Sequence, residues 1–517
     1  MDSKALKRTS PEALGIRSGR ILKLIKDLDS IGNEVHGFMV ARNGCVAAES
    51  WMEPYAADIP HSCHSLGKSY TCTAALIAMT EGLLSPDDLI ADIFRDEIRS
   101  FQIVPHPDME KVTVRHIMTM SSGTKGMPAL NDMWLRNFLA SPMQFEPGST
   151  FMYNTTGSCV LGAVVEKVTG KGLLDYMKEK LFCRIGIGDD DIIWQKFANG
   201  MYAEPGICAT TEANLKLGLF YMAGGFADGE QIIDKKLMKQ AVSQQISTAG
   251  WPDPVGRYGY GFQLWMGSLP GTFRFDGGQG QLCVCYPAKD IAVAIHQAGR
   301  DPGGTGKCLE LIHEFMADSE DVAPNSLPGA FEEDAEALAE LRDYLGSRHI
   351  YVPKPSEETR KAIKLQAEKL AGVYHVVPGD RVQPWIEVVP LDYDFWKYFY
   401  DPSFAVHLKT VEIRPEDGAV RVVFNGRSTV IARFDGQTEV CTTPSPLPGL
   451  DKTCSFAGLD IDGDLRIYIR WLNGWFRCTI MITPLGDGAI GIRTEKDMLH
   501  EGGQTWTGAA KAVIINR

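Results

Sequence analysis

The chain has 517 residues, of which 44% are hydrophobic and 23% are charged, values that are ordinary for globular proteins. This length is too great for one ordinary domain and predicts two to four. The net charge of −13, without any strong basic patch, argues against a nucleic-acid partner and against an acidic membrane surface.

The N-terminal residues carry charges with no apolar run behind them, and no run of 18 apolar residues occurs anywhere. We therefore expect no signal peptide and no membrane-spanning helix, and predict a cytoplasmic protein. The twelve cysteines are scattered without a CxxC pair, which predicts free, buried thiols. His61, Cys63 and His64 are crowded together without a second ligand pair at a fitting spacing, so no metal and no cofactor are expected.

The first predicted elements are a helix and a β-hairpin. Apolar residues recur with helical spacing over 11–31, and 36–49 has the pattern of two strands joined at Asn43-Gly44. A strong helix is expected from about Ser65 to Glu81, because Gly82 provides a stop signal.

Helices dominate the next part of the chain. Ser85-Pro86-Asp87-Asp88 combines the cap, proline and acidic residues of a helix start. Further helices are expected over 112–119, 158–169 and 210–224. From residue 258 short strands with short turns predict an antiparallel meander, followed by a helix at about 305–317. The predicted strands are 258–265, 271–281, 282–286 and 291–295.

This order of elements indicates an α+β fold for residues 1–320, in which the terminal pieces share one antiparallel sheet flanked by helices. Residues 321–366 are acidic and contain proline, with helical patterns at 330–345 and 356–370, and are interpreted as a linker. From 367 to 517 short strands alternate with Asp-Gly and Asn-Gly turns, which predicts a C-terminal antiparallel β-barrel or sandwich.

A Ser-x-x-Lys pattern opens the helix at Ser65. Helical spacing places Ser65 and Lys68 on one face, side by side. A serine hydroxyl needs a neighbour to take its proton, and a poorly solvated lysine can serve because burial disfavours the ammonium form. The helix N-terminus adds N–H groups suited to an oxyanion. The pattern is short enough to arise by chance, and a second match, Ser122 to Lys125, lies in a predicted turn.

An acyl-transfer site also needs a second proton carrier and room for the substrate. Tyr153 stands at a helix start, where a phenolate facing a lysine ammonium can act as a base. The alternative is an ordinary aromatic residue near a helix cap. Gly277, Gly278 and Gly280 end a strand, where small residues let a substrate backbone approach or form a β-bulge.

Taken in this order, the motifs resemble those of the serine β-lactamase and penicillin-binding-protein superfamily. The more similar branch contains class C β-lactamases, D-aminopeptidases, serine esterases and nylon-oligomer hydrolases. The resemblance covers residues 11–320. It rests on Ser65-x-x-Lys68, Met118-Thr119-Met120-Ser121-Ser122-Gly123, Tyr153-Asn154-Thr155-Thr156-Gly157, Tyr258-Gly259-Tyr260-Gly261 and Gly277-Gly278-Gln279-Gly280-Gln281.

The resemblance implies a cofactor-free serine hydrolase that forms an acyl-enzyme on an ester or a peptide-like amide. By the same resemblance, Ser65 is the nucleophile, Lys68 and Tyr153 share the proton transfers, and the N–H groups of Ser65 and Gln279 form the oxyanion hole. The partner is then a small-molecule or short peptide-like substrate, and a homo-oligomer is left open. The alternatives are a penicillin-binding or β-lactamase-type protein, and a sensor that is acylated without turnover.

Two positions depart from the β-lactam-hydrolysing members of the superfamily. Thr155 replaces the asparagine of their Tyr-x-Asn motif, and Asp276, before Gly277 and Gly278, stands where they have lysine or histidine. These four residues are the expected substrate-binding positions. The lysine of those members helps to bind a carboxylate, which an aspartate in the cleft would repel. This predicts poor β-lactamase and D,D-carboxypeptidase activity, unless Asp276 turns out of the cleft.

The C-terminal part carries one further resemblance. Leu370-Ala371-Gly372-Val373-Tyr374 is similar to the opening of the lipocalin-like barrel that follows the catalytic domain in some members of the superfamily. That similarity favours a lipocalin-like barrel for residues 367–517, and the sandwich stays open as the alternative.

Overall fold

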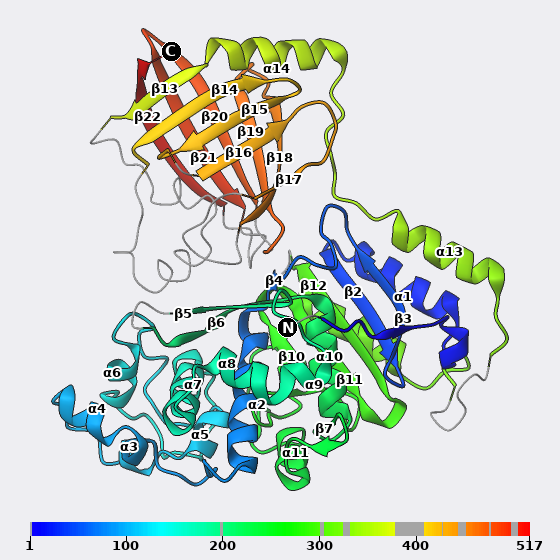
Figure 1. Ribbon diagram of the computed structural model, residues 1–517, viewed down its shortest axis with the longest axis vertical. Coiled ribbons are helices and arrows are strands. Elements are labelled where there is room, and N and C mark those ends of the chain that lie inside the picture. The colour runs from blue at the N-terminus through cyan, green and yellow to red at the C-terminus, as the bar shows by residue number, and fades with distance from the viewer. Residues whose placement is uncertain are drawn as a thin grey trace. The chain divides into compact units, whose positions relative to one another are not determined.

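The computed structural model divides into two compact units (Figure 1). The first holds the chain up to Trp51 with 62–297 and 303–348, and the second holds Met52–His61, a short stretch from Ala298, and the chain from His349. The break at Arg348 falls inside the segment expected to be a linker. The described residues are 3–196, 200–299, 304–323, 331–377, 408–426, 428–442, 451–474, 477–497 and 505–516.

A seven-stranded sheet organises the first unit, in the order β1-β3-β2-β12-β11-β10-β9. The N-terminal hairpin therefore lies beside the last strand of the unit, as the sequence predicts. Asn43 and Gly44 join the hairpin with φ angles of 52° and 70°, the conformation that an Asn-Gly turn favours. The strands are β1 Lys7–Arg8, β2 Glu34–Arg42, β3 Cys45–Trp51, β9 Trp265–Met266, β10 Phe273–Gly277, β11 Gln281–Tyr286 and β12 Ile291–Ala298.

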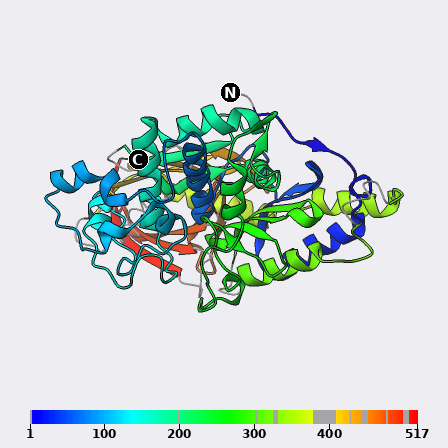
Figure 2. The same ribbon diagram turned by 90° about the horizontal axis from the view of Figure 1, so that it is seen from below.

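Helices cover both faces of this sheet. Helices α1 (Ser18–Ser30) and α12 (Gly304–Met316) share one apolar core with alternate residues of β2, β11 and β12, and both run along the same side of the sheet in Figure 2. Helix α10 (Thr211–Met222) packs on the other face, where Gly218 is required because a Cβ there would lie 2.6 Å from Cys283 Sγ.

A helical region follows the hairpin and carries most of the candidate site. Its central helix, α2 (Gly67–Thr80), is buried from Gly67 to Met79 and packs against α7 (Thr155–Thr169). The other helices of the first unit are α3 Ile90–Ile93, α4 Arg95–Ser100, α5 Val114–Met118, α6 Trp134–Leu139, α8 Leu173–Met177, α9 Cys183–Ile185, α11 Lys235–Ala241 and α13 Ala335–Gly346, and its small sheets use β4 His61–Ser62, β5 Ile192–Lys196, β6 Tyr202–Ala209, β7 Phe226–Ala227 and β8 Glu230–Gln231.

The predicted helix start at Ser85 is wrong. Asp88 Oδ2 accepts a hydrogen bond from the Ser85 N–H at 2.7 Å, which closes a turn, and helix α3 begins only at Ile90. The N–H of Ile90 donates to Val112 O at 2.9 Å, and Leu89 forms an antiparallel β-bridge with Thr113 just before the helix. Side-chain bonds from aspartate and serine favour turns as strongly as helix caps.

The strand predicted over 258–265 is also wrong for most of its length, since only Trp265–Met266 forms β9. Gly259 and Gln263 have φ angles of 107° and 55°, which a strand does not contain. Gly261 fits because a Cβ there would lie 2.1 Å from Ala241 O. The alternating glycines therefore serve a close backbone approach and not a strand.

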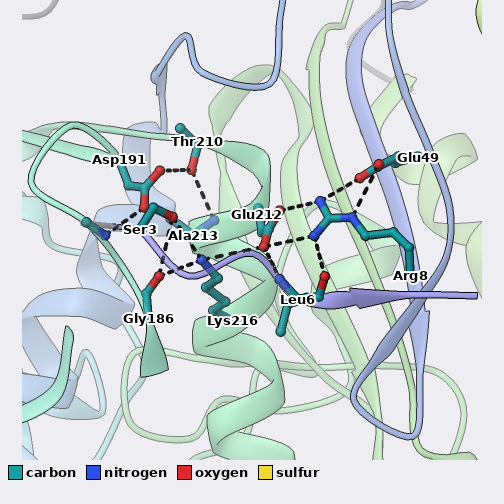
Figure 3. A network of polar contacts seen from close by, with 11 residues as sticks. Ser3, Leu6, Arg8, Glu49, Gly186, Asp191, Thr210, Glu212, Ala213 and Lys216 are labelled. Carbon is teal, nitrogen blue, oxygen red and sulfur yellow. Dashed lines mark hydrogen bonds and ion pairs between the residues drawn. The ribbon is translucent and has the colours of Figure 1, made fainter. Parts of the chain in front are cut away.

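An N-terminal arm, residues 3–8, ties α10 to its neighbours (Figure 3). Glu212 accepts the Leu6 N–H at 2.6 Å and pairs with Arg8, which also reaches Glu49 at 2.9 Å. Lys216, buried on α10, donates to Gly186 O at 2.6 Å. These contacts fix the start of α10 against strand β3 and the end of α9.

In its described residues, the second unit is a closed barrel of nine strands, β13 to β16 and β18 to β22, in which a bridge between Arg433 and Phe456 joins β16 to β18. This confirms the barrel alternative. Its helix α14 (Glu357–Lys369) contributes Ile363 and Ala367 to the barrel core. The strands are β13 Gly372–Val376, β14 Thr410–Glu416, β15 Ala419–Phe424, β16 Ser428–Arg433, β17 Val440–Thr442, β18 Lys452–Leu459, β19 Leu465–Trp471, β20 Arg477–Gly486, β21 Ala489–Asp497 and β22 Thr505–Asn516.

All twelve cysteines lie in the described residues and none forms a disulfide. Nine of them are buried, whereas Cys183 is exposed and Cys45 and Cys441 are half-buried. The prediction of free thiols is therefore confirmed, and the prediction that all are buried is wrong for these three. Within the described ranges, no helix combines the length and the apolar character needed to cross a bilayer.

Candidate active site

Ser65 lies in a single 3-10 turn, His64–Leu66, that leads directly into α2. His64 has a φ of 49°, which is uncommon for a residue other than glycine. The Leu66 N–H donates to Cys63 O at 3.1 Å and closes the turn. Ser65 is thus held at a sharp bend at the N-terminal end of a buried helix, where backbone N–H groups are not used by the helix itself.

The structure brings Ser65, Lys68 and Tyr153 together. Lys68 Nζ lies 2.7 Å from Ser65 Oγ, and the lysine is 1% exposed. The same Nζ lies 5.1 Å from the centroid of the Tyr153 ring. The helical spacing that the sequence suggested therefore produces a direct contact between hydroxyl and amine, with an aromatic ring beside them.

Tyr153 is held by a cluster of aromatic side chains that the sequence did not reveal. Its ring stacks on Trp265, with centroids 6.0 Å apart and planes 16° apart, and lies 6.2 Å from Trp251. Phe151 and Tyr260 complete the cluster. These rings come from three separate segments, so no local pattern reports their proximity. They give the site an apolar wall next to Tyr153.

The turn between β10 and β11 lies against the turn that carries Ser65. A Cβ on Gly277 would lie 2.1 Å from Cys63 O and 3.1 Å from Leu66 N, so β10 touches the backbone of the Ser65 turn. Gly277 therefore makes room for the protein, whereas we expected it to make room for a substrate. Gly278 has more space, since its Cβ would lie 3.6 Å from His64 Nδ1.

Gln279 follows in the single turn Gly278–Gly280 with a φ of 68°. Its backbone belongs to the segment that lies beside His64–Leu66. The predicted pair of oxyanion donors, the N–H groups of Ser65 and Gln279, thus comes from two neighbouring turns of the chain. A positive φ at a residue with a side chain is a strained conformation of the kind found at functional sites.

Asp276 does not carry an isolated charge. Arg274 Nε donates to Asp276 Oδ2 at 2.7 Å, and the Asp276 side chain is 17% exposed. Burial raises the pKa of Asp276, and Arg274 opposes that rise. Because Gly277 faces the Ser65 turn, alternation along β10 directs Asp276 to the other face of the sheet. The expected repulsion of a substrate carboxylate therefore loses its physical basis.

Thr155 is the first residue of α7 and is buried, and its neighbour Asn154 carries the amide of this motif. Asn154 Oδ1 accepts the Gly157 N–H at 3.0 Å, and Asn154 Nδ2 donates to Thr124 Oγ1 at 2.9 Å. This amide is therefore occupied as a helix cap.

The second Ser-x-x-Lys match does not form a pair. Ser122 is buried and lies 3.3 Å from Thr124 Oγ1, whereas Lys125 is exposed. The glycine between them, Gly123, has a φ of 84°, and Thr124 forms an isolated β-bridge with Met143, so the chain bends here without forming a helix. Without a helix, the spacing of three residues does not bring serine and lysine together.

Gln263 is a further residue that the sequence analysis missed. Its Nε2 donates to Ile117 O at 2.9 Å, its Oε1 accepts from Ser158 Oγ at 2.9 Å, and its carbonyl accepts from Ser69 Oγ at 3.2 Å. It therefore joins α5, α7 and α2 behind the site. A glutamine in an irregular loop carries no sequence signal for this role.

Within the described residues, no group of three or more histidine, cysteine, aspartate or glutamate side chains is arranged to hold a metal. Burial raises the pKa of Cys63 to about 12, which keeps its sulfur in the thiol form that metals bind poorly. The Cys63 sulfur also lies 3.6 Å from Asn214 Nδ2.

Several known proteins are similar in sequence to parts of this chain. An uncharacterised protein of Alkalihalophilus pseudofirmus is 23% identical over 308 residues, which are 52% of this chain and 84% of the relative. The lovastatin esterase of Penicillium rubens is 27% identical over 150 residues, 24% of this chain and 37% of the esterase. The human serine beta-lactamase-like protein LACTB is 48% identical over 48 residues, 9% of each chain.

Solved structures show similarity at low identity. A penicillin-binding protein homologue from Caulobacter crescentus matches 60% of this chain and 100% of its own, with 16% identity and a TM-score of 0.48. The octameric penicillin-binding protein homologue from Pyrococcus abyssi matches 96% of this chain and 99% of its own, with 16% identity and a TM-score of 0.44.

The model of the Beta-lactamase family matches residues 35–314, which is more than half of the 517 residues. The matched range contains the sheet from β2 to β12, helix α2 with Ser65 and Lys68, the start of α7 with Tyr153, and the turn at Gln279. The chain therefore belongs to the Beta-lactamase family, and its first unit has the hydrolase fold of that family.

Proposed function

We propose that the protein is a serine hydrolase that forms an acyl-enzyme on an ester or a peptide-like amide. The observation that carries this proposal is the 2.7 Å contact between Ser65 Oγ and the amine of Lys68, a lysine that is 1% exposed. A hydroxyl becomes a useful nucleophile when a base lies within hydrogen-bond reach, and a lysine removed from water is suited to that role.

In the proposed mechanism, Ser65 Oγ attacks the carbonyl carbon of the substrate while Lys68 takes its proton. The negative charge that develops on the carbonyl oxygen is stabilised by the N–H groups of Ser65 and Gln279. Tyr153, beside Lys68, passes the proton taken by Lys68 to the leaving alcohol or amine. Water then attacks the acyl-enzyme and gives up a proton to Lys68 and Tyr153, which deliver it to Ser65 Oγ as the acid leaves.

We further propose that uncharged esters are better substrates than β-lactams or peptides ending in D-alanine. Position 276 supplies no cation for a substrate carboxylate, because the residue there is an aspartate, whose carboxylate accepts a hydrogen bond from Arg274. The aromatic wall formed by Phe151, Trp251 and Trp265 beside Tyr153 favours an apolar group. The name of the Penicillium relative, lovastatin esterase, agrees with ester chemistry.

Labelling with a fluorophosphonate probe tests the proposal. The wild type and Ser122→Ala are expected to label, and Ser65→Ala is expected to remain unlabelled. Labelling of Ser65→Ala together with loss of labelling in Ser122→Ala would overturn the assignment. A panel of p-nitrophenyl esters, D-amino-acid amides and nitrocefin then ranks the substrate classes, and efficient nitrocefin turnover would contradict the preference for esters.

A second candidate is an acyl-sensing or penicillin-binding protein that is acylated without turnover. The observation that favours it is the occupied amide of Asn154 together with Thr155 at the third position of the motif, which leaves this segment without an asparagine facing the acyl group. A burst of p-nitrophenol with no steady state would support the sensor, and sustained turnover supports the enzyme. A cytoplasmic location and a homo-oligomer remain predictions.

A further inference from the structure

A chain of buried polar side chains lies beneath the site and has no part in the mechanism above. It runs through Tyr70, Asn214, His296 and Gln281, each at most 2% exposed. The Tyr70 hydroxyl donates to Asn214 Oδ1 at 2.9 Å, Asn214 Nδ2 lies 3.1 Å from His296 Nε2, and His296 Nδ1 lies 3.0 Å from Gln281 Oε1. Buried polar groups of this kind are costly unless every one has a partner.

One arrangement of donors and acceptors satisfies this chain. With Asn214 Nδ2 facing the ring, His296 Nε2 accepts, and the ring proton lies on Nδ1 and points to Gln281 Oε1. The ring also has a hydrogen bond with the backbone of Ala209. Gln281 Nε2 in turn donates to Gln297 O at 2.6 Å. Burial, with a smaller contribution from His36, lowers the pKa of His296 to about 3, so the ring stays neutral at physiological pH.

One end of the chain meets the turn that holds the nucleophile. Tyr70 is on α2, five residues after Ser65, and Asn214 Nδ2 also lies 3.6 Å from the sulfur of Cys63, two residues before it. The Cys63 carbonyl is the group that closes the Ser65 turn and that Gly277 approaches most closely. A shift of Asn214 would therefore be felt by the backbone on both sides of Ser65.

The other end meets the turn that carries Gln279. Gln281 is the first residue of β11, two positions after Gln279, and its Nε2 lies 3.4 Å from Gly278 O. Gln297 packs on the same turn, since a Cβ on Gly280 would lie 1.9 Å from Gln297 Nε2. The two turns that supply the proposed oxyanion donors are thus connected through side chains as well as through their direct contact.

We propose that Tyr70, Asn214, His296 and Gln281 are positioning residues that set the separation between the Ser65 N–H and the Gln279 N–H. The inference rests on the proposed acyl-enzyme function, because the two N–H groups matter only if an oxyanion forms between them. Donors must stand within about 0.5 Å of their productive position, and the loss of one oxyanion donor lowers kcat by about 100- to 1000-fold.

The test uses the full chain with Asn214→Leu, which keeps the volume and removes the hydrogen bonds to Tyr70 and His296. We expect kcat for p-nitrophenyl butyrate to fall by about 10- to 100-fold, while KM changes by less than about threefold. Phenylboronic acid forms a tetrahedral adduct on the serine and places an oxygen in the oxyanion hole. Its inhibition constant should therefore rise by the same factor as kcat falls, and the pH profile of kcat should keep its shape.

Two variants separate positioning from stability. Tyr70→Phe removes a single hydroxyl. We expect this variant to stay folded and its kcat to fall by about three- to tenfold. Thr73→Val is the matched control, because it removes the buried 2.8 Å contact with the Tyr221 hydroxyl from the same helix but leaves the chain of four intact. It should lower the melting temperature without changing the affinity for phenylboronic acid.

The outcomes can be told apart from a failure of the proposed function. If wild type hydrolyses the ester and Ser65→Ala does not, the acyl-enzyme function stands, and Asn214→Leu and Tyr70→Phe decide the present inference alone. The inference is overturned if folded Asn214→Leu and Tyr70→Phe keep kcat and phenylboronic acid affinity within twofold of wild type. It is also overturned if, in both variants, KM rises by as large a factor as kcat falls. Absence of any hydrolysis or labelling in the wild type overturns both proposals.

Discussion

The chain contains the pattern Ser-x-x-Lys twice, and the two copies adopt different structures. At Ser65 the pattern opens a buried helix, and the lysine amine reaches the serine hydroxyl at 2.7 Å. At Ser122 it lies in a turn, and Lys125 extends into solvent. The comparison teaches that the spacing carries chemistry only where a helix makes residues i and i+3 neighbours and where packing removes water from the lysine.

The second region still serves the site, but as a support. Thr124, in the same turn as Ser122, accepts a hydrogen bond from Asn154 Nδ2 at 2.9 Å. Asn154 in turn caps α7 and directly follows Tyr153. The turn around Ser122 thus holds the segment that carries Tyr153, whereas the turn around Ser65 carries the proposed nucleophile.

The strongest test of this contrast is to remove each lysine amine. Lys68→Met keeps the length of the side chain and eliminates the base, so the acylation rate should fall by about 1000-fold or more, because general-base catalysis contributes up to about 10⁴-fold. The matched variant Lys125→Met alters only an exposed side chain and should change the rate by less than about twofold. Stopped-flow measurement of p-nitrophenol release reports both rates. Equal losses in the two variants would refute the assignment of Ser65.

A second test concerns the contact between β10 and the Ser65 turn. In Gly277→Ala the new Cβ would stand 2.1 Å from Cys63 O, so the Ser65 turn must move, and we expect kcat to fall by about 100-fold, as for misplaced oxyanion donors. In Gly278→Ala the nearest atom is 3.6 Å away, an ordinary contact, and the expected loss is only about threefold.

Steady-state kinetics on p-nitrophenyl butyrate compares the two glycine variants. Their unfolding curves in urea show whether a loss of activity reflects a local shift or global unfolding. If Gly277→Ala proved as active as Gly278→Ala, the close approach of β10 to Cys63 would have no role in catalysis.

Much of the candidate site could be predicted because its signals are local. The Ser65 and Lys68 contact follows from helical spacing, and the hairpin follows from Asn43-Gly44. The place of Tyr153 at a helix start follows from the polar run behind it, although α7 begins at Thr155 and not near residue 158. In each case the physical cause, a backbone period or a turn preference, acts within a few residues.

The parts that could not be predicted depend on segments far apart in the chain. Gly277 owes its role to a backbone that lies more than 200 residues earlier, and Trp251 lies beside Tyr153, which comes from a different segment of the chain. The pairing of Arg274 with Asp276 is different, since strand alternation puts both on one face, and this local signal was available. The alternating glycines near Gly259 imitated a strand because sequence period alone does not reveal a positive φ.

The two regions also differ in how their histidines respond to acid. His296, beneath Ser65, has its pKa lowered to about 3 by burial, far below the value of about 6.5 in an unfolded chain. The unfolded chain then binds a proton that the folded chain does not, so stability present above pH 6.5 is lost as the pH falls. At pH 5 this loss amounts to about 2 kcal/mol for one such histidine.

Urea unfolding of wild type and His296→Gln at pH 7 and pH 5 measures this difference. The variant should lose about 2 kcal/mol less than wild type between the two pH values, whatever its stability at pH 7. His116, beside the Ser122 turn, is only half-buried, and burial followed by Arg115 lowers its pKa. The variant His116→Gln should therefore change the acid sensitivity less than His296→Gln, and the reverse order would contradict the burial argument.

The smallest expected effects lie in the Ser122 turn itself. Ser122→Ala removes one contact of 3.3 Å to Thr124 and should lower the free energy of unfolding by about 0.5–1 kcal/mol with activity within twofold of wild type. Thr124→Val removes the acceptor of the buried Asn154 amide, and an unpaired buried amide costs about 1–3 kcal/mol, so this variant should be the less stable of the two. Because Asn154 follows Tyr153, Thr124→Val should also lower kcat more than Ser122→Ala does. If Ser122→Ala lost more kcat than Thr124→Val, the side chain of Ser122, and not the Thr124 hydroxyl, would be the group of this turn that supports the site.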